Sequence, residues 1–150
     1  MSKNERYESL FKQIKSITSS ESNKLANLVN TIALIHHEFN FWWTGIYFVE
    51  NDELILGPFQ GPVACTRIPK GKGVCGSSFE KKESIVVEDV HQFPGHIACS
   101  SESNSEIVIP LLKDNKVLAV LDIDSKNYGE FDAVDKKHLE CIAKEIVNFL

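Results

Sequence analysis

The sequence has no long apolar run, no basic stripe and no repeated or low-complexity segment. No stretch approaches the ~20 apolar residues that a membrane-spanning helix needs. Sixteen Lys and Arg are scattered among twenty-one Asp and Glu, and the net charge is -5. Nucleic-acid binding needs positive charge clustered on one face, because the protein must neutralise a phosphate backbone. We therefore expect neither a membrane span nor a nucleic-acid partner.

The first fifteen residues, MSKNERYESLFKQIK, lack the apolar core of a secretory signal. We therefore expect a cytoplasmic protein. The four cysteines are not expected to form a static disulfide framework in that reducing compartment. Catalytic, redox or metal-binding roles are favoured, although an inert buried thiol is the alternative for any single cysteine.

The order of apolar patterns predicts one α+β domain over residues 1–150. Helices are expected near 5–17, at 21–40 and at 131–150, the last with Asp132 as N-cap. The expected buried stripe of the second helix comprises Leu25, Leu28, Val29, Ile32 and Ile35. The middle of the chain has strand composition. This order favours a central antiparallel sheet of about six strands, with N- and C-terminal helices packed on one face.

The segment GKGVCG matches the G-x-G-x-x-G pattern of dinucleotide-binding proteins through Gly71, Gly73 and Gly76. That motif also requires a preceding strand and a full helix within a βαβ unit. Pro69 lies immediately upstream, and only a very short helix fits before the next strand. We assign the glycines to a tight turn and close backbone approach instead.

Three of the cysteines, Cys65, Cys75 and Cys99, lie in or beside loops at wide and irregular spacing. Paired C-x-x-C motifs of zinc ribbons are absent from the sequence. A zinc site that combines these three with His96 remains an alternative, and it requires all four to converge. Cys141 lies within the last helix and is expected to pack there.

Strand alternation in VLAVLDIDS puts Asp122 and Asp124 on the face opposite Leu121 and Ile123. The acids either point into solvent or meet a cation or hydrogen-bond donor in a covered site. Val120 lies on their face and favours the covered site.

Glu106 reaches the same face only in one hairpin register. A two-residue turn at Asp114 and Asn115 places Glu106 opposite Ile123, which points it away from both aspartates. A longer loop or a β-bulge shifts the register by one residue and brings Glu106 onto their face. A single site that contains all three acids therefore predicts an irregular hairpin.

Alternation in WWTGIYF separates Trp43, Gly45 and Tyr47 on one face from Trp42, Thr44 and Ile46 on the other. Either face fits an ordinary core. A Trp and a Tyr that flank a glycine also suit the wall of a small-ligand pocket, because the glycine leaves room between them.

Three segments resemble the free methionine-(R)-sulfoxide reductases, small proteins with a GAF fold: GPFQGPVACTRIPKGKGVCG, VVEDVHQFPGHIACSSESNSEIVIPL and VLAVLDIDS…FDAVD. The resemblance extends from about Trp43 to Asp135 and rests on three cysteines in matching contexts. It implies a GAF-like fold, free methionine (R)-sulfoxide as substrate, no bound cofactor and thioredoxin as external reductant. A homodimer is expected by analogy with other GAF domains. A non-catalytic GAF module for ligand binding or redox sensing is the alternative.

The resemblance also implies roles for the thiols. Cys99 corresponds to the nucleophile and Cys65 to the cysteine that forms a disulfide with it. Cys75 corresponds to a second resolving or relay thiol and is the alternative nucleophile. His96, close to Cys99 in sequence, either helps to ionise this thiol or only fixes the loop.

Acids and aromatic residues complete the implied site. Glu106, Asp122 and Asp124 correspond to acids that hold the amino group and the sulfoxide oxygen, and Trp43 and Tyr47 to the wall around the methyl group. Crowded like charges raise the pKa of one carboxyl, so that it stays protonated while a neighbour stays ionised. Either Glu106 or Asp122 is expected to be the proton donor.

Overall fold

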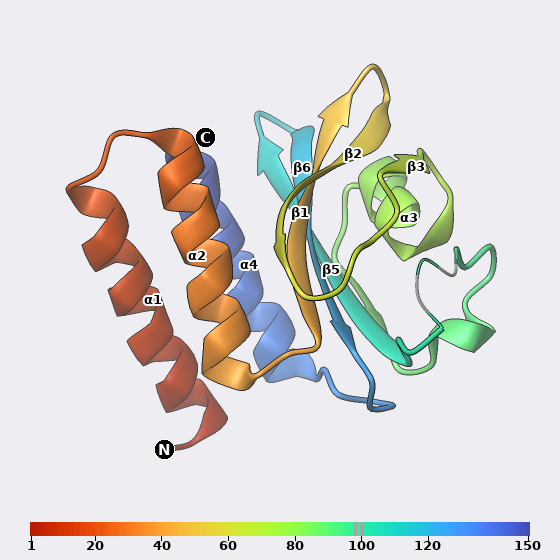
Figure 1. Ribbon diagram of the computed structural model, residues 1–150, viewed down its shortest axis with the longest axis horizontal. Coiled ribbons are helices and arrows are strands. Elements are labelled where there is room, and N and C mark those ends of the chain that lie inside the picture. Colours follow the sequence, from red (N-terminus) through yellow and green to blue (C-terminus); the bar gives the residue numbers. More distant parts are fainter. Residues whose placement is uncertain (98, 100) are drawn as a thin grey trace.

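Within the described residues, 1–97, 99 and 101–150, the computed structural model contains one six-stranded antiparallel sheet and four α-helices (Figure 1). The helices are α1 (Lys3–Ser19), α2 (Lys24–Phe39), α3 (Gly73–Lys81) and α4 (Ala133–Asn148). The strands are β1 (Trp43–Glu50), β2 (Glu53–Gln60), β3 (Arg67–Pro69), β4 (Ile85–Val87), β5 (Ser105–Lys113) and β6 (Lys116–Ser125). Their order in the sheet is β3-β2-β1-β6-β5-β4.

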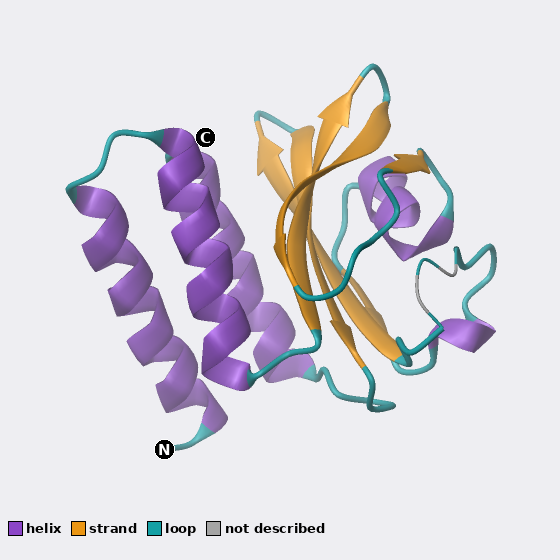
Figure 2. Ribbon diagram, viewed as in Figure 1, coloured by secondary structure: helices purple, strands orange, loops and turns teal. Residues whose placement is uncertain are grey.

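Helices α2 and α4 cover one face of the sheet, with α1 packed on their outer side, and α3 with the long loops covers the other face (Figure 2). The predicted α+β architecture is therefore confirmed. The helix ends follow capping chemistry: Asp132 accepts hydrogen bonds from the backbone N–H groups of Val134 and Asp135 at the start of α4. No helix in the described part of the chain is both long and apolar enough to cross a membrane.

Two apolar clusters lie on opposite faces of the sheet. The helix-side cluster includes Ile46, Ile109 and Leu121, and the cluster under α3 includes Val108 and Val120. Each fully buried Ile or Leu contributes about 1.5–3 kcal/mol to folding. The helix-side cluster therefore fixes β1, β5 and β6 firmly, while the opposite face of the same strands can carry polar groups.

Two expectations about helix faces are wrong. Leu25 and Val29 are 61% and 41% exposed, whereas Leu28 and Ile32 are buried. Cys141 is exposed on α4 rather than packed. Helical spacing identifies the centre of a buried stripe, but it does not tell how far the neighbouring elements reach around the helix.

The β5–β6 hairpin is irregular, as the single-site hypothesis requires. Asp114 and Asn115 form the two-residue turn, both with positive φ. The pairing then shifts between Leu111 and Leu112, so that Glu106 pairs with Asp124 rather than with Ile123. The bulge supplies the one-residue shift, and the three acids share one face.

Candidate active site

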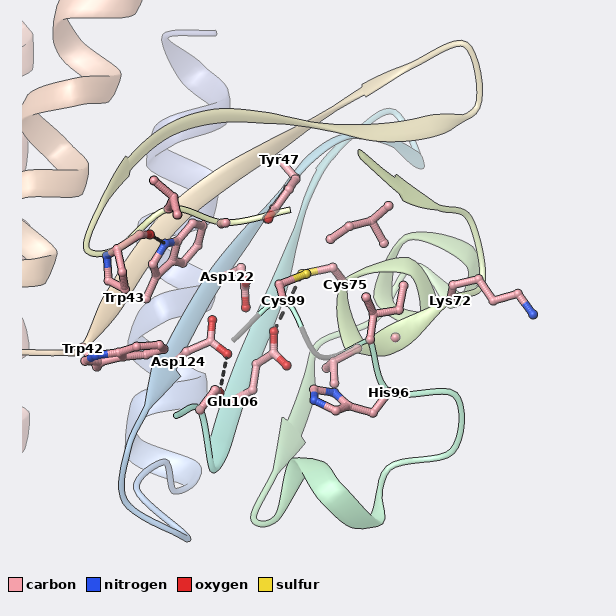
Figure 3. A pocket seen from close by; sticks show the side chains of 18 residues that line it. Trp42, Trp43, Tyr47, Lys72, Cys75, His96, Cys99, Glu106, Asp122 and Asp124 are labelled. Atoms are coloured by element: carbon pink, nitrogen blue, oxygen red, sulfur yellow. Dashed lines mark hydrogen bonds between the residues drawn. The ribbon is translucent and has the colours of Figure 1, made fainter. Parts of the chain in front are cut away.

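A pocket on the α3 side of the sheet collects the acids, the aromatic residues and two of the cysteines (Figure 3). Strand pairing places Trp43 beside Asp124 and Gly45 beside Asp122. The lining comprises Trp42, Trp43, Tyr47, Pro62, Val63, Ala64, Ile68, Lys72, Gly73, Val74, Cys75, His96, Ile97, Cys99, Ser103, Glu106, Asp122 and Asp124. Cys65 joins the same site through its bond to Cys99.

The three carboxyl groups are crowded, and two of them are withdrawn from water. Glu106 is 6% and Asp122 5% exposed. Burial raises the pKa of Glu106 well above its usual range, and the charges of Asp122 and Asp124 raise it further. Burial likewise raises the pKa values of Asp122 and Asp124. Such crowding favours the protonated form of a carboxyl group, and a protonated carboxyl can act as a general acid.

The two aspartates differ in their hydrogen bonds. Ser103 donates from Oγ to Asp124 Oδ1 at 2.8 Å. Asp122 Oδ1 is buried and has no hydrogen-bond partner among the described residues. A buried acceptor without a partner destabilises the fold by about 1–3 kcal/mol. Asp122 is therefore the position at which a cationic ligand gains most.

Two of the pocket thiols are already joined. Cys65 and Cys99 form a disulfide with a Cα–Cα distance of 5.3 Å across a sequence separation of 34. This pairing is the one that the resemblance implies. The alternative zinc site of Cys65, Cys75, Cys99 and His96 is wrong for this oxidised form, because two of its sulfurs are bonded to each other.

Cys75 is a free, buried thiol behind the disulfide. It extends from α3 toward β5 and donates to Glu106 Oε2 at 3.8 Å. Burial raises the pKa of Cys75 well above its usual range, and the negative charges of Asp122 and Glu106 add to the effect. The Cys75 thiol is therefore protonated and a weak nucleophile in this environment.

Trp43 and Tyr47 form a rigid aromatic wall. Their ring centroids lie 6.0 Å apart with an interplanar angle of 26°. Trp43 Nε1 donates to the Pro62 carbonyl at 2.9 Å, and the Tyr47 hydroxyl donates to the Cys65 carbonyl at 2.9 Å. Because both polar atoms bind the 62–65 segment, the ring faces are left for apolar contact.

Sequence reasoning missed several lining residues, among them Trp42 and Ser103. Trp42 was assigned to the face opposite Trp43, but it lines the same pocket. It precedes β1, so strand alternation does not govern its direction. Ser103 lies in the segment 101–104 that precedes β5, where no periodicity exists to predict a side-chain direction.

The glycine motif and His96 have local roles. Gly76 packs so closely that an added Cβ would lie 2.5 Å from the Pro69 carbonyl oxygen, which is the close approach expected. The rejected dinucleotide site has no βαβ unit, because β3 and β4, the strands on either side of α3 in the sequence, lie at opposite edges of the sheet. His96 borders the pocket, and burial, with His91 nearby, lowers its pKa. A neutral imidazole does not supply the positive charge that would ionise Cys99.

Comparison with known proteins places this chain in a family. The GAF domain family model matches residues 25–150. The chain is 50% identical to GAF domain-containing protein A of Dictyostelium discoideum, over 98% of this chain and 94% of the relative. It is 43% identical to free methionine-R-sulfoxide reductase of Escherichia coli (strain K12), over 100% and 92%.

A solved structure agrees with the fold. The X-ray structure of free methionine-R-sulfoxide reductase from Neisseria meningitidis in complex with its substrate matches with a TM-score of 0.96 and 45% identity. The match covers 99% of this chain and 90% of that one. With its domain fold, its Cys65–Cys99 disulfide and its full-length similarity to these reductases, the chain belongs to the free methionine-R-sulfoxide reductase family of GAF-domain proteins.

Proposed function

We propose that this protein reduces free methionine (R)-sulfoxide to methionine with electrons from its own thiols. The observation that carries the proposal is the Cys65–Cys99 disulfide beside a pocket lined by three carboxyl groups, two of them buried. A zwitterionic sulfoxide needs a thiolate, a proton donor, a carboxylate for its ammonium group and an apolar slot for its methyl group. This pocket offers each of them.

The substrate can be oriented from the contacts of the pocket. The ammonium group binds Asp122, whose Oδ1 has no other partner among the described residues. The methyl group lies against Trp43 and Tyr47, and the sulfoxide oxygen faces Glu106. The carboxylate points toward Gly73 and the start of α3, the positive end of the helix dipole.

The chemical step transfers one oxygen atom. The Cys99 thiolate attacks the sulfoxide sulfur and forms a bond to it, while Glu106 protonates the sulfoxide oxygen. As this intermediate collapses, the hydroxyl group moves to the Cys99 sulfur, the bond between the two sulfurs breaks, and methionine is released. The oxygen stays on Cys99 as a sulfenic acid. The Cys65 thiol then condenses with it, water leaves, and the disulfide of this structure results. Methionine sulfur gains the two electrons that the cysteine pair loses.

Glu106 suits the donor role better than Asp122. The pKa of Glu106 is raised well above its usual range by burial and by both aspartates, so Glu106 retains its proton near neutral pH. Cys99 suits the attack better than Cys75, because Cys75 is buried among acids that keep its thiol protonated.

The direct test incubates reduced protein with the separate R and S epimers of free methionine sulfoxide and with a peptide-bound form. The free R epimer alone should give stoichiometric methionine with the loss of two thiols, and peptide mapping should find Cys99 joined to Cys65. Absence of methionine with all thiols still titratable would contradict the proposal and favour a ligand-binding or redox-sensing module.

Replacement of Cys65 by serine separates the two halves of the cycle. Cys65→Ser should still release one methionine per Cys99, because the attack does not need Cys65. Turnover with thioredoxin should fall by at least about tenfold, since no disulfide forms for dithiol exchange. Rapid-quench and steady-state assays measure the two quantities. Equal loss of both would contradict the resolving role.

Gly45 gives a steric test of the aromatic wall. A Cβ at Gly45 would lie 2.4 Å from Trp43 Cη2, so Gly45→Ala must displace the indole. Overpacking of this kind costs about 1–3 kcal/mol. When substrate binding loses the same free energy, KM rises roughly ten- to a hundredfold. Gly57→Ala is the matched control, because its Cβ meets Phe48 outside the pocket. An unchanged KM in Gly45→Ala would exclude this wall from substrate binding.

We also propose thioredoxin as the reductant, a cytoplasmic location and a homodimer. A stable disulfide needs a strongly reducing dithiol, which thioredoxin supplies in reducing compartments. No bound cofactor is required, because the thiols carry the electrons. Leu25 and Val29 give α2 an exposed apolar strip that a second copy could cover. Light scattering of the wild type and of Leu25→Ser tests the dimer.

A further inference from the structure

The pocket contains a cluster of donor atoms suited to a metal ion. Single ligand atoms from Cys75, Glu106 and Asp122 all lie within 4.8 Å of one another, and all three residues are buried. They come from α3, β5 and β6, three elements that pack together. Figure 3 shows these side chains close together in the pocket, with a dashed line from Cys75 to Glu106.

Two further observations point to a cation. Asp122 Oδ1 is buried and unpartnered among the described residues, although Asp122 is only 5% exposed. In the described part of the chain, Lys and Arg form their ion pairs with other acids, such as Asp132, Asp135, Glu38 and Glu53. Among the described residues, no Lys or Arg therefore forms an ion pair with the carboxyl groups of this cluster.

We propose that Cys75, Glu106 and Asp122 bind a thiophilic divalent cation of the Zn²⁺ type. One sulfur and two carboxylate oxygens suit this borderline-soft ion, whereas Mg²⁺ and Ca²⁺ prefer oxygen alone. Three protein ligands leave the fourth tetrahedral position open toward the pocket. The protons that the thiol and the carboxyl groups carry leave as the ion binds.

The geometry allows this site with small side-chain movements. Tetrahedral bonds of about 2.0–2.3 Å place ligand atoms roughly 3.3–3.8 Å apart. Cys75 Sγ and Glu106 Oε2 are already 3.8 Å apart. The site persists in the oxidised form, because the Cys65–Cys99 bond leaves Cys75 free.

One consequence rests on the proposed function. The ion takes the Asp122 carboxylate that we assign to the substrate ammonium and the Glu106 carboxyl that we assign to proton donation. Metal and amino acid therefore exclude each other, and Zn²⁺ inhibits the reductase in competition with its substrate.

Co²⁺ titration of the oxidised protein tests the site without an activity assay. Thiol counting first confirms that only Cys75 and Cys141 are free, as in the structure. Wild type and Cys141→Ser should both show a thiolate-to-cobalt charge-transfer band that saturates at one equivalent and disappears on addition of Zn²⁺. Cys75→Ser should show no band. Circular dichroism verifies its fold, and Cys75→Ala serves as a second variant.

The acids give a graded control. Glu106→Gln and Asp122→Asn should each weaken Co²⁺ binding roughly ten- to a hundredfold. Asp124→Asn should weaken it less, because Asp124 Oδ1 already accepts from Ser103. A band that survives in Cys75→Ser, or no band in the wild type, overturns the site. A cobalt band that added methionine leaves unchanged overturns only the competition, which separates failure of the proposed function from failure of the metal site.

Discussion

Replacement of Cys99 by serine should reduce methionine formation by roughly 10⁴-fold or more, because a hydroxyl near neutral pH is a far weaker nucleophile than a thiolate. The loss should appear in the first turnover, before any recycling. Rapid-quench measurement of methionine from reduced protein and excess free R epimer gives the rate. Methionine binding, measured by calorimetry, should persist because the acids and the aromatic wall remain.

The controls for Cys99→Ser use the other thiols. Cys141→Ser changes an exposed thiol on α4, away from the pocket, and should leave the rate unchanged. Retention of the first turnover in Cys99→Ser together with its loss in Cys75→Ser would exchange the two roles. All variants must be compared in the reduced state, because the disulfide closes a separation of 34 residues. A loop of that size contributes about 3–4 kcal/mol to stability.

Strand alternation was sufficient to place Asp122 and Asp124 on one face, but it could not fix the position of Glu106. The decisive feature is the shift between Leu111 and Leu112. Residues 107–111 are apolar and buried on both faces, so a one-residue slip leaves no trace in their hydrophobic pattern. From the sequence it could be predicted only that the three acids share a site if the hairpin register shifts by one residue.

Other parts of the site depended on contacts between distant segments. The pairing of Cys65 with Cys99 followed from family resemblance, because four cysteines allow three connectivities and spacing does not choose among them. Trp42 was misplaced because β1 begins one residue later. Local patterns predict which face a residue takes within a helix or strand, but they do not predict side-chain directions in turns or at the ends of these elements.

Glu106→Gln should have the second-largest effect on activity and an opposite effect on stability. Loss of a general acid lowers the rate roughly 10²–10⁴-fold. The free energy of unfolding at pH 8 should rise by about 0.5–2 kcal/mol, as is common when a buried functional group is relieved. The physical reason is that burial and two neighbouring aspartates disfavour a charge on this carboxyl.

The pH dependence identifies the group responsible. Because the folded pKa of Glu106 is raised, the folded protein keeps a proton that the unfolded chain loses above about pH 4.3. Unfolding then releases this proton. The contribution of Glu106 to stability is therefore greatest below that value and falls as pH rises toward the folded pKa.

Urea melts between pH 4 and 8 should show a shallower fall in the free energy of unfolding for Glu106→Gln than for the wild type. The exposed Glu8→Gln should keep the wild-type slope. An unchanged slope in Glu106→Gln would contradict a protonated Glu106. A residue that merely supported the pocket would lose activity and stability together, so their opposite changes distinguish a proton donor from a packing residue.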